Sequence, residues 1–360
     1  MAIKEQSVQK PLRLVYMDHA STTAVDRRVV EAMLPYFDKE YGNASSLHTL
    51  GRQAHQAMED ARQTVADVLG AAPKEIIFTS CGSESDNLAI RGVALASREK
   101  GNHIITSAIE HHAVIHTCEQ LEKEFGFRVT YLPVDERGSV NPDDVGRAIT
   151  NETVLISIMY ANNEVGTIQP IAEIGQIARA RRIPFHTDAV QAGGVLDLNV
   201  DKLGVDLLSL SAHKFYGPKG VGVLYHRHHT PLLPVQTGGG HEHRLRAGTE
   251  NIPYIVALAT ALKLAHDHRE DNNARVSMLR DRLVQDIQTQ IPDAYLTGHP
   301  THRLPNNASF VFKGIEGESI LLNLDLKGVA VSTGSACSSA SHEASHVLRA
   351  LGLPTQICHS

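Results

Sequence analysis

Short blocks of apolar residues alternate with polar blocks along the chain, and the spacing within the blocks predicts alternating strands and helices. Apolar runs of strand length lie in residues 75–79, 103–107, 128–134, 153–159, 185–188, 206–211 and 221–225. Helical patterns or helix starts mark residues 52–69, the segment from about Glu84, the segment after residue 108, and residues 171–180. This repeated strand–helix–strand order predicts a mostly parallel sheet with helices on both faces.

The last third of the chain has a different pattern. Long amphipathic helices are predicted over residues 252–291, and a strand is predicted over residues 303–312. A chain of 360 residues is long enough for two domains, or for one large domain with an ample core. We therefore expect a second, smaller unit after the α/β sheet.

The composition is that of an ordinary globular protein, with 42% hydrophobic and 21% charged residues. The formal net charge of −6 argues against nucleic acid as the main partner. No apolar run is long enough to span a bilayer, and the first ten residues lack the apolar core of a secretion signal. We expect a cytoplasmic protein that does not enter membranes.

The cysteines and histidines do not predict a metal site. The four cysteines form no CxxC pair and no zinc spacing, which favours free thiols in a reducing compartment; they are Cys81, Cys118, Cys337 and Cys358. Histidines cluster in two places where solvated loops are favoured over adventitious metal binding, namely His226, His228 and His229, and His241 and His243. Cys81 and Cys118 are expected to be inert.

Candidate chemistry begins where the strand in residues 206–211 ends. Lys214 follows this strand, beside Ser211 and His213, and precedes a second apolar run. Lysine is rarely buried without a role, and a desolvated lysine loses its proton and becomes a nucleophile toward carbonyl carbon. The alternative is a solvated loop lysine, for which Lys219 is the natural candidate.

A carboxylate is placed in the same way at the end of another strand. Asp188 ends the strand in residues 185–188, and parallel strands open together on the edge of the sheet where ligands bind. A lysine that can react with an aldehyde, together with an acid that can pair with a pyridinium nitrogen, is typical of a pyridoxal phosphate site. We therefore expect Lys214 and Asp188 to serve one cofactor.

A third segment offers groups for a phosphate. In residues 75–90 a short strand meets a turn at Gly82 and Ser83, after which a helix begins. Backbone N–H groups at a helix start attract anions, so Gly82 and Ser83 are candidate phosphate ligands. Taken alone, the segment could equally be an ordinary helix cap; its combination with Lys214 and Asp188 favours the phosphate.

Together these segments resemble the fold-type I pyridoxal phosphate enzymes, and among them the cysteine desulfurases of the IscS/NifS type in the class-V aminotransferase family. The resemblance extends over about residues 14–354 and includes the opening segment 16–23 and the glycine-rich segment 236–251. It implies a mostly parallel seven-stranded sheet sandwiched by helices, plus a smaller α+β domain. The implied division is an N-terminal arm and small-domain segment (1–24), a large cofactor-binding domain (25–258) and a small domain (259–360).

The resemblance also implies roles for single residues. Lys214 would carry pyridoxal phosphate and move the substrate's Cα proton, Asp188 would keep the ring nitrogen protonated, and His111 would stack on the ring. His112 is its neighbour, but successive helical positions point about 100° apart, so only one of the two can stack. The alternative for His111 is a helix-start histidine that solvent satisfies.

Further contacts to the cofactor are implied for residues on other segments. Asn163 and Gln191 would contact the phenolic oxygen of the ring. The phosphate would be held by Gly82, Ser83, Ser211, His213 and Thr249. In the family the threonine reaches the cofactor of the other subunit, so Thr249 implies a homodimer with shared active sites.

Within the stretch 329–352, Cys337 lies in a run of small, polar, glycine-containing residues, which predicts an exposed, mobile loop. Exposure favours reactivity in a cysteine. The run resembles the desulfurase motif whose cysteine accepts sulfur. The implied reaction converts L-cysteine to L-alanine, leaves a persulfide on Cys337, and passes the sulfur to an iron–sulfur scaffold or another acceptor protein.

The sequence departs from the family pattern at its end. It stops at Ser360, before the segment in which the family has an arginine that pairs with the substrate carboxylate, and Arg349 does not suit that role. Either the given chain is part of a longer one, or amino-acid binding is expected to be impaired. Two rivals stay open: an aminotransferase or selenocysteine lyase on the same scaffold, and a non-catalytic homologue that serves as an assembly platform.

Overall fold

The computed structural model describes residues 13–334, 344–354 and 356–358 of the chain. The strands are β1 Val15–Tyr16, β2 Ile76–Thr79, β3 His103–Ser107, β4 Arg128–Leu132, β5 Thr153–Ser157, β6 Phe185–Asp188, β7 Leu207–Ser211, β8 Gly222–His226, β9 Ala294–Leu296, β10 Phe310–Phe312 and β11 Val329–Ala330. The α-helices are α1 Arg27–Met33, α2 Pro35–Asp38, α3 Thr49–Leu69, α4 Gly82–Ala96, α5 His112–Phe125, α6 Pro142–Ala148, α7 Ile171–Arg181, α8 Val200–Leu203, α9 Ile252–Asp267, α10 Arg269–Gln290, α11 Gly317–Asp325 and α12 His346–Ala350.

Seven strands form one central sheet in the order β2-β8-β7-β6-β5-β3-β4. Strands β7, β6, β5, β3 and β4 run parallel to one another, whereas β8 is antiparallel to both β7 and β2. Apart from the edge strand β4, these strands are almost entirely buried, as expected for a sheet covered on both faces. The predicted fold class, with seven mostly parallel strands, is confirmed.

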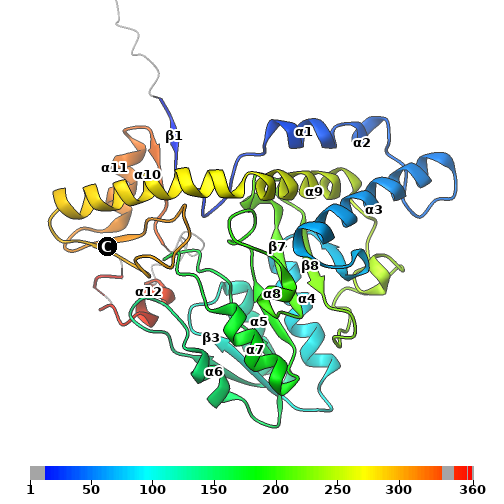
Figure 1. Ribbon diagram of the computed structural model, residues 1–360, viewed down its shortest axis with the longest axis horizontal. Helices are drawn as coiled ribbons and strands as arrows, with labels where there is room; N and C mark the ends of the chain where they lie inside the picture. Colours follow the sequence, from blue (N-terminus) through cyan, green and yellow to red (C-terminus); the bar gives the residue numbers. More distant parts are fainter. Residues whose placement is uncertain (1–12, 335–343, 355, 359–360) are drawn as a thin grey trace, which may run out of the picture.

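In strand β2, alternate residues enter two different cores, because successive side chains of a strand point to opposite faces. Ile76 and Phe78 of β2 belong to the core that includes Ile255 of α9. Ile77, between them, belongs to the core that includes Leu88 of α4. Helices α1, α3 and α9 lie together at the top of Figure 1 and cover the first face. Helices α4 and α5 cover the second.

The long helices predicted over residues 252–291 are α9 and α10. They are separated only at His268, and Figure 1 shows α10 continuing from α9 toward α11. Helix α9 buries one side in the core, whereas α10 has no fully buried residue. None of the helices in the described ranges has the length and apolarity needed to cross a membrane.

The short strands outside the central sheet form two pairs. The short strand β1 pairs in parallel with β11, so the beginning of the chain joins its last third, and β9 pairs antiparallel with β10. The strand predicted over residues 303–312 is wrong in its length, since only Phe310–Phe312 is extended. The physical reason is the buried side chain of Arg303, which donates to the carbonyl oxygen of Thr297 and to Oδ1 of Asn307 and so organises a loop. The domain boundary at residue 258 lies within α9 and stays a prediction.

Candidate active site

The predicted acid lies at the carboxyl end of a central parallel strand. Asp188 is the last residue of β6 and is 5% exposed, and its Oδ1 accepts a hydrogen bond from the backbone N–H of Val190 at 2.9 Å. Burial raises the pKa of this carboxyl, whereas His111 and Lys214 oppose the rise. A buried acid with cationic neighbours suits a ligand that carries a protonated nitrogen.

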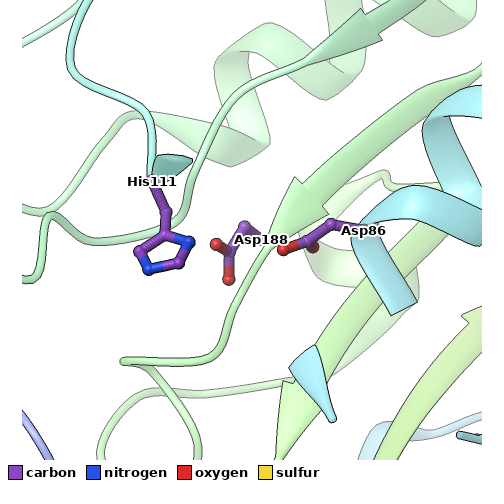
Figure 2. A group of neighbouring side chains, drawn as sticks. All are labelled: Asp86, His111 and Asp188. Atoms are coloured by element: carbon purple, nitrogen blue, oxygen red, sulfur yellow. The ribbon is translucent and has the colours of Figure 1, made fainter. Parts of the chain in front are cut away.

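His111 faces Asp188 from the start of α5 (Figure 2). Its Nδ1 accepts a hydrogen bond from the backbone N–H of Ala113 at 3.1 Å, which leaves Nε2 to carry the proton of a neutral ring. Burial lowers the pKa of His111, although Asp188 opposes this shift. A neutral, anchored imidazole at this position can stack on a planar ligand.

His111 and His112 are not two successive positions of a helix, so the predicted helical separation of their side chains is wrong. Helix α5 begins at His112, and His111 is the N-cap with extended backbone angles of φ −63° and ψ 149°. The cap conformation, rather than the helical rotation of about 100° per residue, therefore turns the His111 ring toward Asp188 (Figure 2).

A second buried carboxyl group, Asp86 of α4, lies on the far side of Asp188 from His111 (Figure 2). One ligand atom from each of Asp86, His111 and Asp188 lies within 4.8 Å of the other two. Burial raises the pKa of Asp86 well above its usual range, and the charge of Asp188 adds to the rise. Because two acids so close in a buried site do not both ionise, we assign the proton to Asp86 and the charge to Asp188.

A chain of buried hydrogen bonds supports Asp86 from within the sheet. Ser209 hydrogen-bonds to the Asp86 carboxyl group and also lies 3.0 Å from Nε2 of His186, measured from its Oγ. Nδ1 of His186 lies 2.8 Å from Oγ of Ser157. Burial lowers the pKa of His186 to about 3, so the imidazole is neutral and its 3.6 Å approach to Oδ1 of Asp86 is not an ion pair.

The predicted lysine reaches back to the N-terminal segment. Lys214 lies in the short helical turn η2 (Ala212–Lys214), directly after β7, and is partly buried. Its Nζ donates to the carbonyl oxygen of Ser21 at 2.8 Å and to that of Ala20. Nε2 of Gln191 donates to the same Ala20 oxygen at 3.0 Å. The structure thus brings Lys214 and Gln191, which are predicted cofactor ligands, to one point beside residues 20–21.

Residues 22–23 hold the turn that carries Lys214. Oγ1 of Thr23 donates to the carbonyl oxygen of His213 at 3.0 Å, and Oγ1 of Thr22 lies 3.2 Å from Nδ1 of His213. Burial, with a smaller effect from the charge of Lys214, lowers the pKa of His213 to about 4. His213 is therefore a neutral ring at physiological pH, able to donate a hydrogen bond without adding charge.

The start of α4 is the predicted phosphate-binding segment. The helix begins at Gly82, two residues earlier than predicted, and its N-cap Cys81 makes no side-chain capping hydrogen bond. A Cβ atom on Gly82 would lie only 2.7 Å from Cγ2 of Val190 and 3.4 Å from Cβ of Ser211. Glycine thus allows the helix start to approach the ends of β6 and β7, with Ser83 exposed beside it.

Two ion pairs attach the glycine-rich segment 236–251 to the rest of the molecule. The buried Arg62 of α3 makes two hydrogen bonds of 2.8 Å to the carboxylate of Glu242. Nε of Arg246 donates to Oε1 of Glu84, in the first turn of α4, at 2.7 Å. Thr249 follows and is exposed, so the structure leaves its side chain accessible instead of placing it in this chain's own site.

The two adjacent asparagines after β5 differ in role. Asn162 is fully buried and structural, since its Nδ2 donates to the carbonyl oxygen of Ile109 and its Oδ1 accepts from the backbone N–H groups of Glu164 and Val165. Asn163, the predicted cofactor ligand, is only half-buried. Its assignment as the ligand of the ring oxygen stays a prediction.

The cysteines divide by burial. Cys337, the predicted sulfur acceptor, lies outside the described residues. Cys118 is fully buried in α5, and burial raises the pKa of its thiol far above the usual range, which agrees with its predicted inertness. Cys81 is partly buried at the cap of α4, and Cys358 is 7% exposed.

Comparison with known proteins agrees with this geometry. The family model described as aminotransferase class-V matches residues 15–352. The cysteine desulfurase IscS of Methanosarcina thermophila is 54% identical over 98% of this chain and 87% of its own length. A solved NifS-like protein superposes with a TM-score of 0.90 at 40% identity, covering 96% of this chain and 92% of that one. A solved structure of SspA in complex with cysteine gives a TM-score of 0.82 at 38% identity, covering 95% and 96%.

The chain belongs to the class-V aminotransferase family, and within it to the cysteine desulfurases of the IscS/NifS type. These are pyridoxal phosphate enzymes, and the residues present fit that cofactor. The buried carboxylate at a strand end would pair with its ring nitrogen, and the neutral imidazole that faces this carboxylate would stack on its ring. The lysine beside the same edge of the sheet would bind its aldehyde carbon. The start of α4, whose N-cap makes no side-chain hydrogen bond, would hold its phosphate. The ligand atoms of Asp86, His111 and Asp188 also lie close enough together to hold a metal ion.

Sequence reasoning missed a second buried acid, Glu110, as well as Asp86. Oε1 of Glu110 accepts hydrogen bonds from Oγ of Ser107 at 2.5 Å and the backbone N–H of Met159 at 3.0 Å, while Oε2 has no hydrogen-bond partner among the described residues. Burial raises the pKa of Glu110 to about 8. The available signal for Asp86 was its position four residues after Gly82, on the buried face of α4.

Proposed function

We propose that this protein removes sulfur from L-cysteine, forming L-alanine and a persulfide on Cys337. The observation that carries the proposal is the meeting of Asp188, His111 and Lys214 at one edge of the sheet in a chain that is 54% identical to a cysteine desulfurase. The solved relative SspA, in complex with cysteine, supports cysteine as the substrate.

Pyridoxal phosphate, when bound, supplies an electron sink for the bonds at the substrate's Cα. Asp188 keeps a negative charge at the ring nitrogen, because the neighbouring acid Asp86 takes the shared proton. His111 stacks as a neutral ring, and Asn163 and Gln191 hold the phenolic oxygen. Lys214 carries the cofactor between turnovers and afterwards moves the Cα proton as base and then acid.

The phosphate contacts are assigned to residues at the ends of two central strands and at the start of α4. They are Gly82, Ser83, Ser211 and His213. The backbone N–H groups of the first turn of α4, whose N-cap Cys81 makes no side-chain capping hydrogen bond, complement the charge of a phosphate, and the close approach of Gly82 to Ser211 supports a shared ligand.

Sulfur transfer requires a thiolate at Cys337. The Cys337 sulfur attacks the substrate sulfur, so that an S–S bond forms as the Cβ–S bond breaks. The electron pair of the broken bond stays with the carbon, which takes up a proton and becomes the methyl group of alanine. The persulfide then passes its outer sulfur to an acceptor, for which an iron–sulfur scaffold protein is the first candidate.

The active enzyme is proposed to be a cytoplasmic homodimer with shared active sites. The Arg246–Glu84 pair fixes the segment 236–251 to the first turn of α4, the Arg62–Glu242 pair fixes it to α3, and Thr249 is exposed on it. An exposed threonine at this position supports a contact with the phosphate of a partner subunit. The domain division at residues 24 and 258 belongs to the same proposal.

Replacement of the acceptor cysteine tests the reaction. Cys337→Ser should keep the yellow colour of the bound cofactor but lose steady-state alanine release from L-cysteine, because no thiolate takes the sulfur. Cys358→Ser is the matched control and should keep activity, because Cys358 packs in a separate cluster and a serine hydroxyl can donate to the same backbone carbonyls. Continued alanine release by the Cys337→Ser protein would contradict the assigned role, and turnover only with an added 2-oxo acid would favour an aminotransferase.

A further inference from the structure

The side chain of Glu164 lies beside both flanks of the segment that contains Cys337. The structure describes the chain up to Gly334 and again from residue 344, so Gly334 and Ser345 are on the two sides of this segment. Oγ of Ser345 donates a hydrogen bond of 2.5 Å to Oε2 of Glu164. A Cβ atom on Gly334 would lie only 3.2 Å from the same Oε2. One carboxyl oxygen is therefore close to both flanks.

The backbone of Glu164 is fixed by two asparagine side chains. Its N–H donates to Oδ1 of Asn162 at 2.9 Å, and its carbonyl oxygen accepts from Nδ2 of Asn307 at 3.1 Å. Asn162 is fully buried and also donates to the carbonyl oxygen of Ile109, two residues before His111. The Glu164 side chain therefore starts from a place that is fixed relative to the candidate active site.

The contact with Ser345 holds the start of a helix. Ser345 is 5% exposed and is the N-cap of α12, where its Oγ accepts a hydrogen bond from the backbone N–H of Leu348 at 3.2 Å. The same hydroxyl group donates to Glu164, so it uses both its donor and its acceptor function. The hydrogen bond thus joins α12 to the loop that carries Asn163 and Glu164.

The Glu164 carboxyl group is also held out of water. Burial raises its pKa to about 7, although the hydrogen bond from Ser345 opposes this rise. Removing a carboxyl group from water is unfavourable unless it forms hydrogen bonds. A buried acid between two flanks of a reactive segment is therefore expected to have a role there.

We propose that Glu164 is a positioning residue for sulfur transfer, which fixes both ends of the segment that contains Cys337 relative to the cofactor site. This role rests on the proposed function of Cys337 as the sulfur acceptor. Glu164 acts through Gly334 and Ser345, without contacting the substrate. A thiol reacts fast only where it is held near its target, so loss of Glu164 should slow the transfer step and leave substrate binding unchanged.

The first test examines the segment without turnover. The pyridoxal phosphate-loaded protein is treated with a small amount of a nonspecific protease, and cuts between residues 334 and 345 are mapped by mass spectrometry. Cleavage under these conditions follows the population of locally opened protein. Glu164→Ala should raise the rate of cleavage between these residues about fivefold, the effect expected from the loss of one hydrogen bond.

Three further variants isolate the hydrogen bond. Glu164→Gln keeps the length of the side chain and an oxygen that can accept from Ser345, so its cleavage should stay near the wild-type rate. Ser345→Ala removes the same hydrogen bond from the other side and should also speed cleavage. Glu173→Ala, at an exposed acid of α7, is the matched control and should have no effect. Circular dichroism of each variant checks that it folds.

The second test separates substrate binding from sulfur transfer in the first turnover. The change in the visible spectrum on addition of L-cysteine reports binding, and the mass of the intact protein reports persulfide on Cys337. Glu164→Ala should bind L-cysteine with wild-type affinity but form the persulfide about 10-fold more slowly or worse, and Glu164→Gln should restore the rate.

Cleavage of the Glu164→Ala protein at the wild-type rate would overturn the proposal. Faster cleavage throughout the chain would also overturn it, because it would show general destabilisation, and so would equally fast cleavage of Glu164→Ala and Glu164→Gln. A wild-type protein that forms no persulfide would contradict the desulfurase assignment itself. Equal rates of persulfide formation in wild type and Glu164→Ala would contradict only the role of Glu164.

Discussion

At the scale of single residues, the site is governed by carboxyl groups that are removed from water. Asp86, Glu110 and Asp188 are all buried, and burial is the largest cause of the raised pKa of each. Only Asp188 has His111 and Lys214 as neighbours that favour its charged form. This difference decides which acid can pair with a cationic ring nitrogen, and leaves the other two as neutral, hydrogen-bonded acids.

Removing the charge of Asp188 should therefore slow the reaction without unfolding the protein. Asp188→Asn keeps the shape of the side chain, and we expect kcat for alanine formation to fall by about 100-fold or more, in line with the loss of one buried electrostatic contact in other active sites. The matched control is Asp197→Asn, at an acid that is 44% exposed. A loss of less than about threefold for Asp188→Asn would contradict the role given to this carboxylate.

Glu110 should make folding stability fall as the pH rises. Its pKa is about 8 in the folded protein against an ordinary value of 4.5, so between these values the folded state holds a proton that the unfolded state has released. The stability contribution is complete below pH 4.5 and is lost as the pH rises to 8. Glu110→Gln should remove this decline.

Urea denaturation between pH 5 and pH 8 checks the effect of Glu110. Relative to wild type, the Glu110→Gln protein should gain stability steadily across this range, by up to about 1.4 kcal/mol per pH unit. Glu124→Gln, an exposed position on α5, is the control and should follow the wild-type curve. Parallel curves for wild type and Glu110→Gln would show that Glu110 is ionised in the fold.

The sequence predicted the site residues that directly follow strands, but not the acids that are buried between packed elements. Lys214 and Asp188 could be predicted because polar residues directly after apolar runs mark strand ends. Asp86 and Glu110 could not, because an acid in a helix or loop is usually solvated, and its burial depends on which elements pack against it.

At the scale of elements, the start of α4 is the most constrained feature of the site. Gly82 brings this helix against the end of β6, where a Cβ atom would lie 2.7 Å from Val190. The sequence predicted a helix here but placed its start near Glu84, because the turn residues Gly82 and Ser83 have low helix propensity. The three-dimensional fit of Gly82 against Val190 is not visible in the local sequence.

Gly82→Ala should therefore weaken cofactor binding. The added methyl group forces either Val190 or the helix start to move, and we expect the Kd for pyridoxal phosphate, measured by absorbance after removal of the cofactor, to rise by about 10-fold or more, equivalent to about 1.4 kcal/mol. Gly146→Ala in α6 is the matched control, because its Cβ atom would be 3.9 Å from its nearest neighbour, Ile177. Equal affinities in the two variants would contradict the phosphate site.

At the scale of the whole molecule, the topology places segments that are remote in sequence around one edge of the sheet. Asp188 and Lys214 lie at the ends of the central strands β6 and β7. Residues 20–23 form hydrogen bonds with the turn that contains Lys214. The segment 236–251 is held by ion pairs with Arg62 and Glu84. The order of strands and helices in the sequence predicted the fold class. It did not predict that β8 lies between β7 and β2 and runs antiparallel to both.

The most direct test of the desulfurase assignment is one assay on the purified wild-type protein. Its visible spectrum is recorded, L-cysteine is added with a reductant, and sulfide and alanine are quantified. We predict a visible cofactor band together with sulfide and alanine in equal amounts. A cofactor band without either product would contradict the reaction, and the absence of any band would contradict the site built on Lys214 and Asp188.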